Sequence, residues 1–176
     1  MKRAIVVVDM INDFVYGKFG SERARGIVSS VSTLVDTARK RGDLIVFTRD
    51  AHSSSDPELE IWGDHAMKGT AGSEIIPDLK VKEGDHVIEK TTYSSFFNTN
   101  LDEVLKKHGI KEVVIVGVTT DICVRHTAAD AFFRGYKIVI PKECVQTISD
   151  EIQDRALDEM KRLYKARIEE LSKVIS

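Results

Sequence analysis

Short apolar runs alternate along this chain with longer segments in which apolar residues recur every three or four positions. The short runs are rich in β-branched residues, which is typical of strands buried on both faces. They lie at residues 4–8, 44–47, 86–89, 113–116 and 138–140. The longer segments have helical periodicity, and they lie at residues 27–38, 101–105, 122–133 and 152–164. This alternation predicts an α/β fold in which a parallel sheet carries helices on both faces.

Glycines and polar residues mark several helix ends. Gly42 and Gly109 stand where two of the predicted helices stop, and Asn100 stands where a cap is expected. The last apolar stripe can be continued to Leu171 and Val174, either as a cover for the sheet or as a contact with a second subunit. Because no repeat or linker interrupts the pattern, we expect one domain over residues 1–176.

Composition narrows the function classes. The chain of 176 residues is 42% hydrophobic and 31% charged, as in a globular protein, and its 26 basic and 28 acidic side chains leave a formal net charge of -2. That balance argues against a general nucleic-acid binder. No apolar run reaches the roughly 20 residues that cross a bilayer. Two distant cysteines favour a reducing, cytoplasmic environment over a disulfide framework.

Ionisable or nucleophilic side chains follow four of the predicted strands. Asp9 follows the first strand, Asp50 the second and Lys90 the third, and Cys123 lies a turn after the fourth. In open parallel sheets, ligands bind beyond the carboxyl ends of the strands, where these side chains converge. A cysteine attacks as a thiolate, which a nearby ammonium stabilises while a carboxylate accepts the proton. Strong coupling requires Asp9 and Lys90 to lie within about 8 Å of the sulfur.

Cys123 also stands near the start of the predicted helix 122–133, in a turn that begins at Thr119. The free N–H groups and the dipole of a helix N-terminus lower the pKa of a thiol and can hold an oxyanion. We therefore expect a lowered pKa for Cys123. The second cysteine, Cys144, has no charged strand end beside it and is interpreted as a buried, inert thiol.

A carboxylate and two imidazoles form a second group of candidate site residues. They are Asp50, His52 and His65. Alternate positions in an extended segment can point two ligands at one centre, and this donor set suits zinc, iron or manganese. Three protein ligands leave a position for water or substrate. Because Asp-x-His is a common sequence, solvated loop histidines remain the alternative.

Several aromatic side chains fall in segments that follow strand ends. They are Phe14, Trp62, Tyr93, Phe96 and Phe97. Such side chains can line an apolar slot for a small, flat substrate. The alternative is that they pack beneath loops.

Three sequence blocks link the strand-end residues to a known family. The blocks are VDMINDF at 8–14, KTTYSSF at 90–96 and GVTTDICV at 117–124. Together they resemble the isochorismatase-like cysteine hydrolases, which include nicotinamidases and N-carbamoylsarcosine amidase. The resemblance runs from Lys2 to Val145 and implies a three-layer αβα sandwich with a mainly parallel sheet. Since family members are commonly oligomers, it also implies a homo-oligomer that acts on a small-molecule amide.

By this resemblance, Asp9, Lys90 and Cys123 form a catalytic triad. Asp9 takes the thiol proton and passes it to the leaving amine, while Lys90 holds the thiolate charge. Cys123 attacks the carbonyl and gives a thioester that water hydrolyses. The resemblance further implies an oxyanion hole made by the N–H groups of Thr119 and Cys123. It also implies a cis peptide bond between Val118 and Thr119.

The metal-binding segment of nicotinamidases is matched as well, by DAH at 50–52, WGDH at 62–65 and GTAG at 69–72. The resemblance implies a divalent metal, with zinc as the first choice. The expected ligands are Asp50, His52 and His65. In nicotinamidases the metal anchors the pyridine ring of the substrate. The expected substrate contacts are Phe14, Trp62 and Tyr93.

The leading hypothesis is a cysteine amidohydrolase that releases ammonia from a small carboxamide, with nicotinamide as the first substrate. The alternative is an N-carbamoyl amino acid, whose carboxylate needs a basic partner such as Arg49 or Arg125, although a surface ion pair is the simpler role for Arg125. A catalytically silent binding protein on the same fold is a remoter alternative. An aspartyl phosphatase would need a second acid where Ile11 stands and would leave Cys123 without a role.

Overall fold

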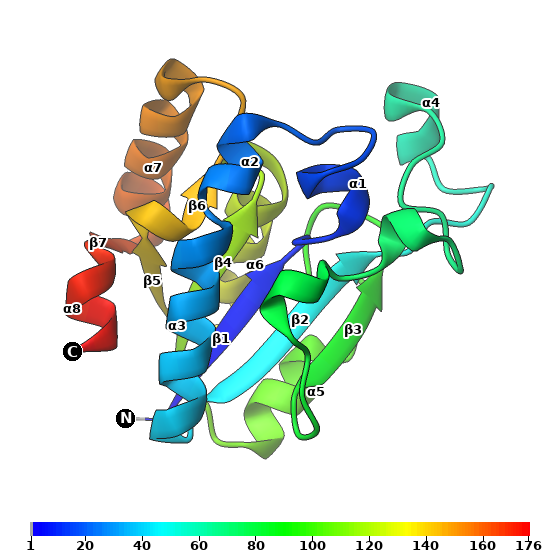
Figure 1. Ribbon diagram of the computed structural model, residues 1–176. Coiled ribbons are helices and arrows are strands. Elements are labelled where there is room, and N and C mark those ends of the chain that lie inside the picture. Colours follow the sequence, from blue (N-terminus) through cyan, green and yellow to red (C-terminus); the bar gives the residue numbers. More distant parts are fainter. Residues whose placement is uncertain (1) are drawn as a thin grey trace.

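A sheet of seven strands forms the centre of the computed structural model, which describes residues 2–176 (Figure 1). The strands are β1 Arg3–Val8, β2 Leu44–Asp50, β3 His86–Lys90, β4 Glu112–Val118, β5 Lys137–Pro141, β6 Val145–Gln146 and β7 Arg167–Glu169. Their order is β3-β2-β1-β4-β5-β7, and β6 pairs with β4. The paired strands run parallel to one another. Each of the predicted strands is present, which confirms the parallel sheet.

The order of the strands reverses between β1 and β4. From β1 the chain adds β2 and β3 on one side, and it then returns to add β4 and β5 on the other. Ligands bind at such a switch point, beyond the carboxyl ends of the strands. The two strands lie close there, because a Cβ atom on Gly117 (φ 115°) would be 1.9 Å from the carbonyl oxygen of Val8. Only glycine fits this position.

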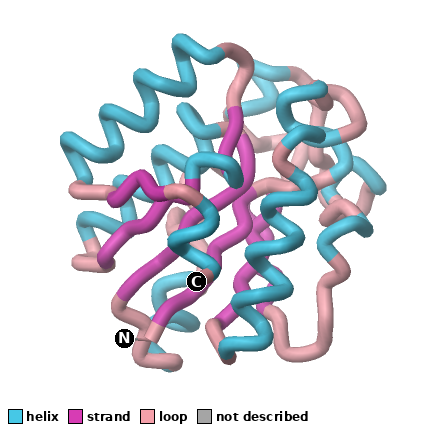
Figure 2. The backbone as a smooth tube through the Cα atoms, turned by 60° about the vertical axis from the view of Figure 1, so that its left-hand side comes forward, coloured by secondary structure: helices cyan, strands magenta, loops and turns pink. Residues whose placement is uncertain are grey.

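Helices cover both faces of the sheet, and Figure 2 shows them on either side of the strands. The α-helices are α1 Asn12–Val15, α2 Glu22–Gly26, α3 Val28–Arg41, α4 Glu58–Trp62, α5 Leu101–Lys107, α6 Arg125–Phe133, α7 Asp150–Tyr164 and α8 Leu171–Ile175. Shorter helical turns are η1 Ala71–Ser73, η2 Pro77–Leu79, η3 Thr120–Val124 and η4 Lys142–Cys144. Within residues 2–176, every helix falls short of the length and apolar character that a membrane crossing requires.

Strand β1 shows how the sequence builds two apolar layers. Val6 and Val8 pack in the layer that contains residues of α5, α6 and α7, whereas Ile5 and Val7 pack in the layer that contains α3. All four side chains are buried because β1 lies between β2 and β4 with a layer on each side. Burying a side chain of this size contributes roughly 1.5–3 kcal/mol, which favours the observed register. The predicted three-layer αβα sandwich is confirmed.

The C-terminal segment departs from the prediction. Helix α7 ends at Tyr164, and Lys165 takes a left-handed conformation (φ 54°), so the apolar stripe does not continue as one helix. The chain instead forms β7, which pairs with β5, and then α8. Val174 packs in the layer that contains α3, on the opposite face of the sheet from Met160. The predicted continuation to Val174 was wrong because a strand intervenes.

The predicted helix ends are partly confirmed. Gly42 (φ 78°) and Gly109 (φ 68°) take the left-handed conformation that ends a helix. Asn100 makes no side-chain cap, and the hydroxyl of Thr99 instead accepts a hydrogen bond from the N–H of Leu101 (3.3 Å). The predicted helix 122–133 divides into the π-helical turn η3 and the α-helix α6.

Candidate functional site

Three charged side chains meet at the carboxyl ends of neighbouring strands. Asp50 and Lys90 pair directly in the register of β2 and β3, and Asp9 follows β1 on the other side of β2. The exposed fractions are 0% for Asp9, 1% for Asp50 and 1% for Lys90. Charges buried this deeply require partners, and these residues supply them to one another.

The Lys90 ammonium donates hydrogen bonds to Asp50, Thr92 and Cys123 and forms an ion pair with Asp9. Its Nζ atom lies 2.7 Å from Oδ2 of Asp9, 2.6 Å from Oδ1 of Asp50 and 2.9 Å from the carbonyl oxygen of Thr92. The Cys123 sulfur lies 3.8 Å away. Burial opposes the charge on Lys90, but the adjacent carboxylates outweigh burial and raise its pKa well above the ordinary value. Lys90 is therefore a fixed cation beside the sulfur.

Asp9 is held in an unusual backbone conformation. Its φ of 52° lies in the left-handed region, which non-glycine residues seldom occupy and which is found at functional sites. The N–H of Asp9 donates to the carbonyl oxygen of Thr48 (2.9 Å), and Oδ1 accepts from the N–H of Asp50 (2.9 Å). Burial, followed by Asp50, raises the pKa of Asp9 to about 7 even though Lys90 lowers it. A carboxyl group with that pKa can accept and return a proton near neutral pH.

Cys123 lies in the turn η3, and 6% of its surface is exposed. Its sulfur and a carboxylate oxygen of Asp9 lie within 4.8 Å of each other, so the requirement that Asp9 and Lys90 lie near the sulfur is met. The prediction of a lowered thiol pKa was wrong. Burial raises the pKa of Cys123 well above its ordinary value, and the negative charges of Asp9 and Asp50 offset the effect of Lys90. The resting thiol therefore keeps its proton beside a carboxylate that can accept it.

The peptide bond between Val118 and Thr119 is cis, as predicted. It joins the end of β4 to the turn that carries Cys123. Thr119 and Cys123 border the same cavity. Both residues expected to supply the oxyanion hole therefore lie at the cavity wall.

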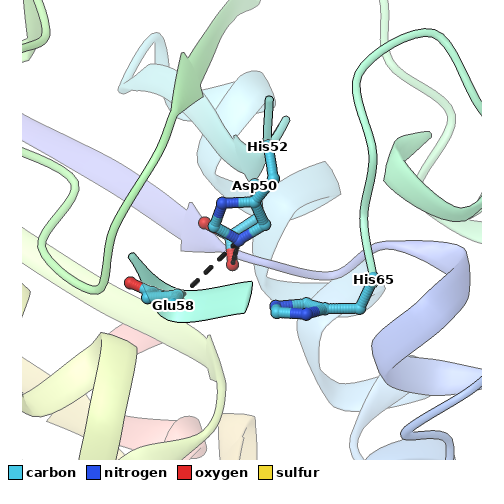
Figure 3. A group of neighbouring side chains, drawn as sticks. All are labelled: Asp50, His52, Glu58 and His65. Carbon is cyan, nitrogen blue, oxygen red and sulfur yellow. Dashed lines mark ion pairs between the residues drawn. The ribbon is translucent and has the colours of Figure 1, made fainter. Parts of the chain in front are cut away.

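The predicted metal ligands lie together, and a fourth residue joins them (Figure 3). Asp50 ends β2 and His52 follows it by two residues, while Glu58 comes from α4 and His65 from the loop that follows α4. One candidate ligand atom from each of the four side chains lies within 4.8 Å of the others. The sequence reasoning missed Glu58. Its spacing from His52 carries no metal signal, and only the fold of α4 over the site brings it there.

The chemistry of these donors fits a divalent cation. Nδ1 of His52 lies 3.0 Å from Asp56, and Nδ1 of His65 lies 2.7 Å from the carbonyl oxygen of Gly63. Both acceptors require a proton on Nδ1, which leaves each Nε2 lone pair available to a metal. Nε2 of His52 and Oε1 of Glu58 are buried without a hydrogen-bond partner. Two imidazoles and two carboxylates form a donor set that suits zinc.

The contact between Asp56 and Nδ1 of His52 can be tested by measuring zinc affinity. We predict that Asp56→Asn weakens zinc binding by about 10- to 100-fold, because Asp56 orients the His52 ring and raises its basicity. Isothermal titration calorimetry of chelator-treated protein measures the effect. The matched control is Asp154→Asn on the exposed surface of α7, which is expected to bind zinc as the unmodified protein does. Equal affinities for the two variants would contradict the prediction.

A cavity of about 310 Å³ opens beside Cys123 and the metal cluster. Phe14, Trp62 and Tyr93 line it, as predicted, and the indole N–H of Trp62 donates to the hydroxyl of Tyr93 (3.2 Å). Of the other aromatics considered, Phe96 is buried in the apolar core and Phe97 lines a different pocket. Three further apolar residues that the sequence reasoning did not assign to the cavity also line it. They are Phe19, Ile122 and Ile148.

Within the described residues, no lysine or arginine lines this cavity. Arg125 points to Glu159, with 2.7 Å between their charged atoms. Arg49 contacts Glu74 (2.8 Å) and Glu89 (3.0 Å). Both candidate partners for a substrate carboxylate are therefore engaged elsewhere, and the surface ion pair expected for Arg125 is confirmed.

Comparison with known proteins assigns the chain to a family. Residues 3–171 match the isochorismatase domain. The chain belongs to the isochorismatase family. Nicotinamidase 3 of Arabidopsis thaliana is 36% identical to this isochorismatase-family protein over 160 residues, which cover 88% of the present chain and 78% of the plant protein. The family assignment makes the chain an isochorismatase-like hydrolase and agrees with the observed fold.

Two solved structures that are similar to this isochorismatase-family hydrolase are an N-carbamoylsarcosine amidase and a pyrazinamidase. N-Carbamoylsarcosine amidase from Thermoplasma acidophilum has a TM-score of 0.93 and 42% identity, with 97% of each chain covered. The pyrazinamidase of Pyrococcus horikoshii, solved in complex with zinc, has a TM-score of 0.89 and 31% identity, with 97% of this chain and 99% of that chain covered. Similarity alone therefore does not separate the two substrate classes.

Proposed function

We propose that this protein is a cysteine amidohydrolase that cleaves the C–N bond of a small, neutral carboxamide and releases ammonia, with nicotinamide as the first candidate substrate. The observation that carries the proposal is the contact of the Cys123 sulfur with the Lys90 ammonium, 3.8 Å apart, at the wall of an apolar cavity. The proton acceptor is Asp9, whose pKa of about 7 suits transfer in both directions.

In the first half of the proposed reaction, Asp9 takes the thiol proton as the Cys123 sulfur attacks the carbonyl carbon. Lys90 stabilises the sulfur's developing negative charge. The N–H groups of Thr119 and Cys123 donate to the oxyanion of the tetrahedral intermediate, and hydrogen bonds of this kind account for much of the rate enhancement in acyl transfer. Asp9 then returns its proton to the leaving nitrogen, the C–N bond breaks, and ammonia leaves a thioester on Cys123.

In the second half, water attacks the thioester carbonyl while Asp9 accepts a proton from it. The C–S bond breaks, the sulfur takes the proton back, and the carboxylic acid product leaves. Asp50, His52, Glu58 and His65 would hold a divalent metal beside this centre. When bound, that metal would supply a coordination position for a ring nitrogen of the substrate.

The neutral aromatic substrate is favoured by the lining of the cavity. Phe14, Trp62 and Tyr93 offer flat apolar surfaces, which suit an aromatic ring. An N-carbamoyl amino acid remains the second candidate because of the 42% identity to N-carbamoylsarcosine amidase. Its carboxylate would enter a cavity whose described lining contains no lysine or arginine. Burying a charge without a partner is costly, so nicotinamide is preferred.

Ammonia release from a substrate panel tests this choice. We predict that nicotinamide and pyrazinamide are hydrolysed, and that kcat/KM for N-carbamoylsarcosine is lower by about 100-fold or more, as expected when a buried charge is left unpaired. A coupled glutamate dehydrogenase assay, with and without added zinc, measures the release.

The panel also separates the alternatives. A higher kcat/KM for N-carbamoylsarcosine than for nicotinamide would overturn the substrate choice and retain the amidase. No ammonia from any compound, with zinc supplied, would overturn the amidase and favour a binding protein on the same fold.

A further inference from the structure

The residues that line the cavity beside Cys123 are buried at its inner end and exposed at its outer end. At the inner end, Cys123 is 6% exposed and His65 is 4% exposed. At the outer end, Phe19 is 39%, Trp62 is 41% and Ile148 is 74% exposed. These three apolar side chains come from separate segments, namely the loop after α1, helix α4 and the loop after β6. The reactive inner end therefore continues into an apolar mouth.

Ile148 is held firmly at this mouth although most of its surface is exposed. The hydroxyl of Thr147 donates to Asp121 (2.5 Å), and the Thr147 carbonyl oxygen accepts from Arg23 (2.6 Å). On the other side, the hydroxyl of Ser149 accepts from the N–H of Ile152 at the start of α7 (3.3 Å). Residues on both sides of Ile148 are thus fixed by hydrogen bonds. Ile148 forms an exposed apolar group with Phe19 and Trp62 at the cavity, and such groups mark ligand-binding grooves.

The volume of the cavity exceeds the needs of a single ring. Cavities of roughly 300 Å³ and above bury drug-sized ligands, and this cavity measures about 310 Å³. A single-ring carboxamide whose carbonyl carbon reaches the Cys123 sulfur and whose ring lies toward His65 would occupy the inner end. Ile148, which lies in the loop after β6 and is 74% exposed, would not be covered by such a ring.

We infer that the preferred substrate is a neutral aromatic carboxamide with an apolar substituent on its ring, and that this substituent lies against Ile148 and Phe19. The inference rests on the proposed function and names its substrate class more narrowly. Charged substituents are disfavoured, because the described wall of the mouth offers no lysine or arginine and the Asp121 carboxylate is already bonded to Thr147.

The test compares nicotinamide with nicotinamides that carry a phenyl group at ring carbon 5 or ring carbon 6. We expect at least one phenyl compound to have a kcat/KM about tenfold or more above that of nicotinamide, since burial of apolar area strengthens binding. Ile148→Ser should lower the ratio of the two kcat/KM values by about tenfold. The matched control is Leu163→Ser, an exposed residue of α7 outside the cavity, which should leave the ratio unchanged.

Each other outcome overturns the inference in a distinguishable way. Hydrolysis of nicotinamide with no gain for either phenyl compound overturns the extended substrate and leaves the proposed function intact. A loss in Ile148→Ser that is equal for all compounds and accompanied by a change of mass in light scattering shows a subunit contact instead. No ammonia from any compound overturns the proposed function and this inference together.

Discussion

Replacing Cys123 by alanine is expected to lower kcat/KM for nicotinamide by about 10³-fold or more, as nucleophile deletions typically do. The reason is that no other described side chain offers a thiol to the cavity, and Asp9 and Lys90 would then act on no nucleophile. The measurement is steady-state ammonia release with zinc supplied. Because Cys123 is a small side chain in the turn η3, the variant should keep the fold, which circular dichroism verifies.

Cys144→Ala is the matched control for this substitution. Cys144 is fully buried in the apolar layer that contains α3, away from the cavity, and burial followed by Glu143 raises its pKa to about 12. Its loss should change kcat/KM by less than about twofold, since it touches no reacting group. Retained ammonia release in Cys123→Ala would instead show that Cys123 is not the nucleophile, and it would overturn the proposed cysteine mechanism.

The sequence predicted the fold where apolar periodicity was strong. The run at 113–116 lies within β4, whose residues are all buried, so its pattern reflects the sheet directly. Strands β6 and β7 escaped prediction because they contain two and three residues, too few to show a period. The stripe on α7 was extended too far, since the conformation of Lys165 depends on the pairing of β7 with β5 and not on local apolar spacing.

The candidate site was predictable where residues follow strands. Asp9, Asp50 and Lys90 stand at strand ends, and parallel pairing alone brings such positions together. Glu58 and Ile148 were not predictable in this way, because both lie on segments whose placement over the sheet depends on tertiary packing. The thiol pKa was predicted in the wrong direction because a sequence shows charged neighbours but not the depth at which they are buried.

Asp50 connects the two parts of the site. Its Oδ1 atom contacts Lys90 at 2.6 Å, and its Oδ2 atom lies 3.6 Å from Nε2 of His52. Burial opposes ionisation of Asp50, but Lys90 and then His52 outweigh burial and lower its pKa. One carboxylate thus serves both the cation beside Cys123 and the candidate metal cluster. We therefore expect a substitution in either part to alter the electrostatics of the other.

This shared carboxylate leads to the largest expected effect on stability. Lys90→Met keeps a long, unbranched side chain but removes the ammonium, which leaves Asp9 and Asp50 buried without their cation. We predict that the free energy of unfolding falls by about 3–5 kcal/mol near pH 8, as when one partner of a buried ion pair is removed. Urea denaturation in the presence of chelator measures the loss. Lys106→Met, on the exposed side of α5, is the matched control.

The pH dependence of this loss identifies its cause. Lys90 lowers the pKa of Asp9, which is nevertheless about 7 in the folded protein, so removal of Lys90 raises that pKa further above the unfolded value. A folded state that binds more protons than the unfolded state loses stability as pH rises. The difference in the free energy of unfolding between Lys90→Met and the unmodified protein should therefore become smaller as pH falls from about 8 to about 5. Adding Asp9→Asn should also recover part of the loss, since it removes one unpaired charge. A deficit that is constant with pH and unchanged by Asp9→Asn would mean that Lys90 stabilises the fold by packing alone.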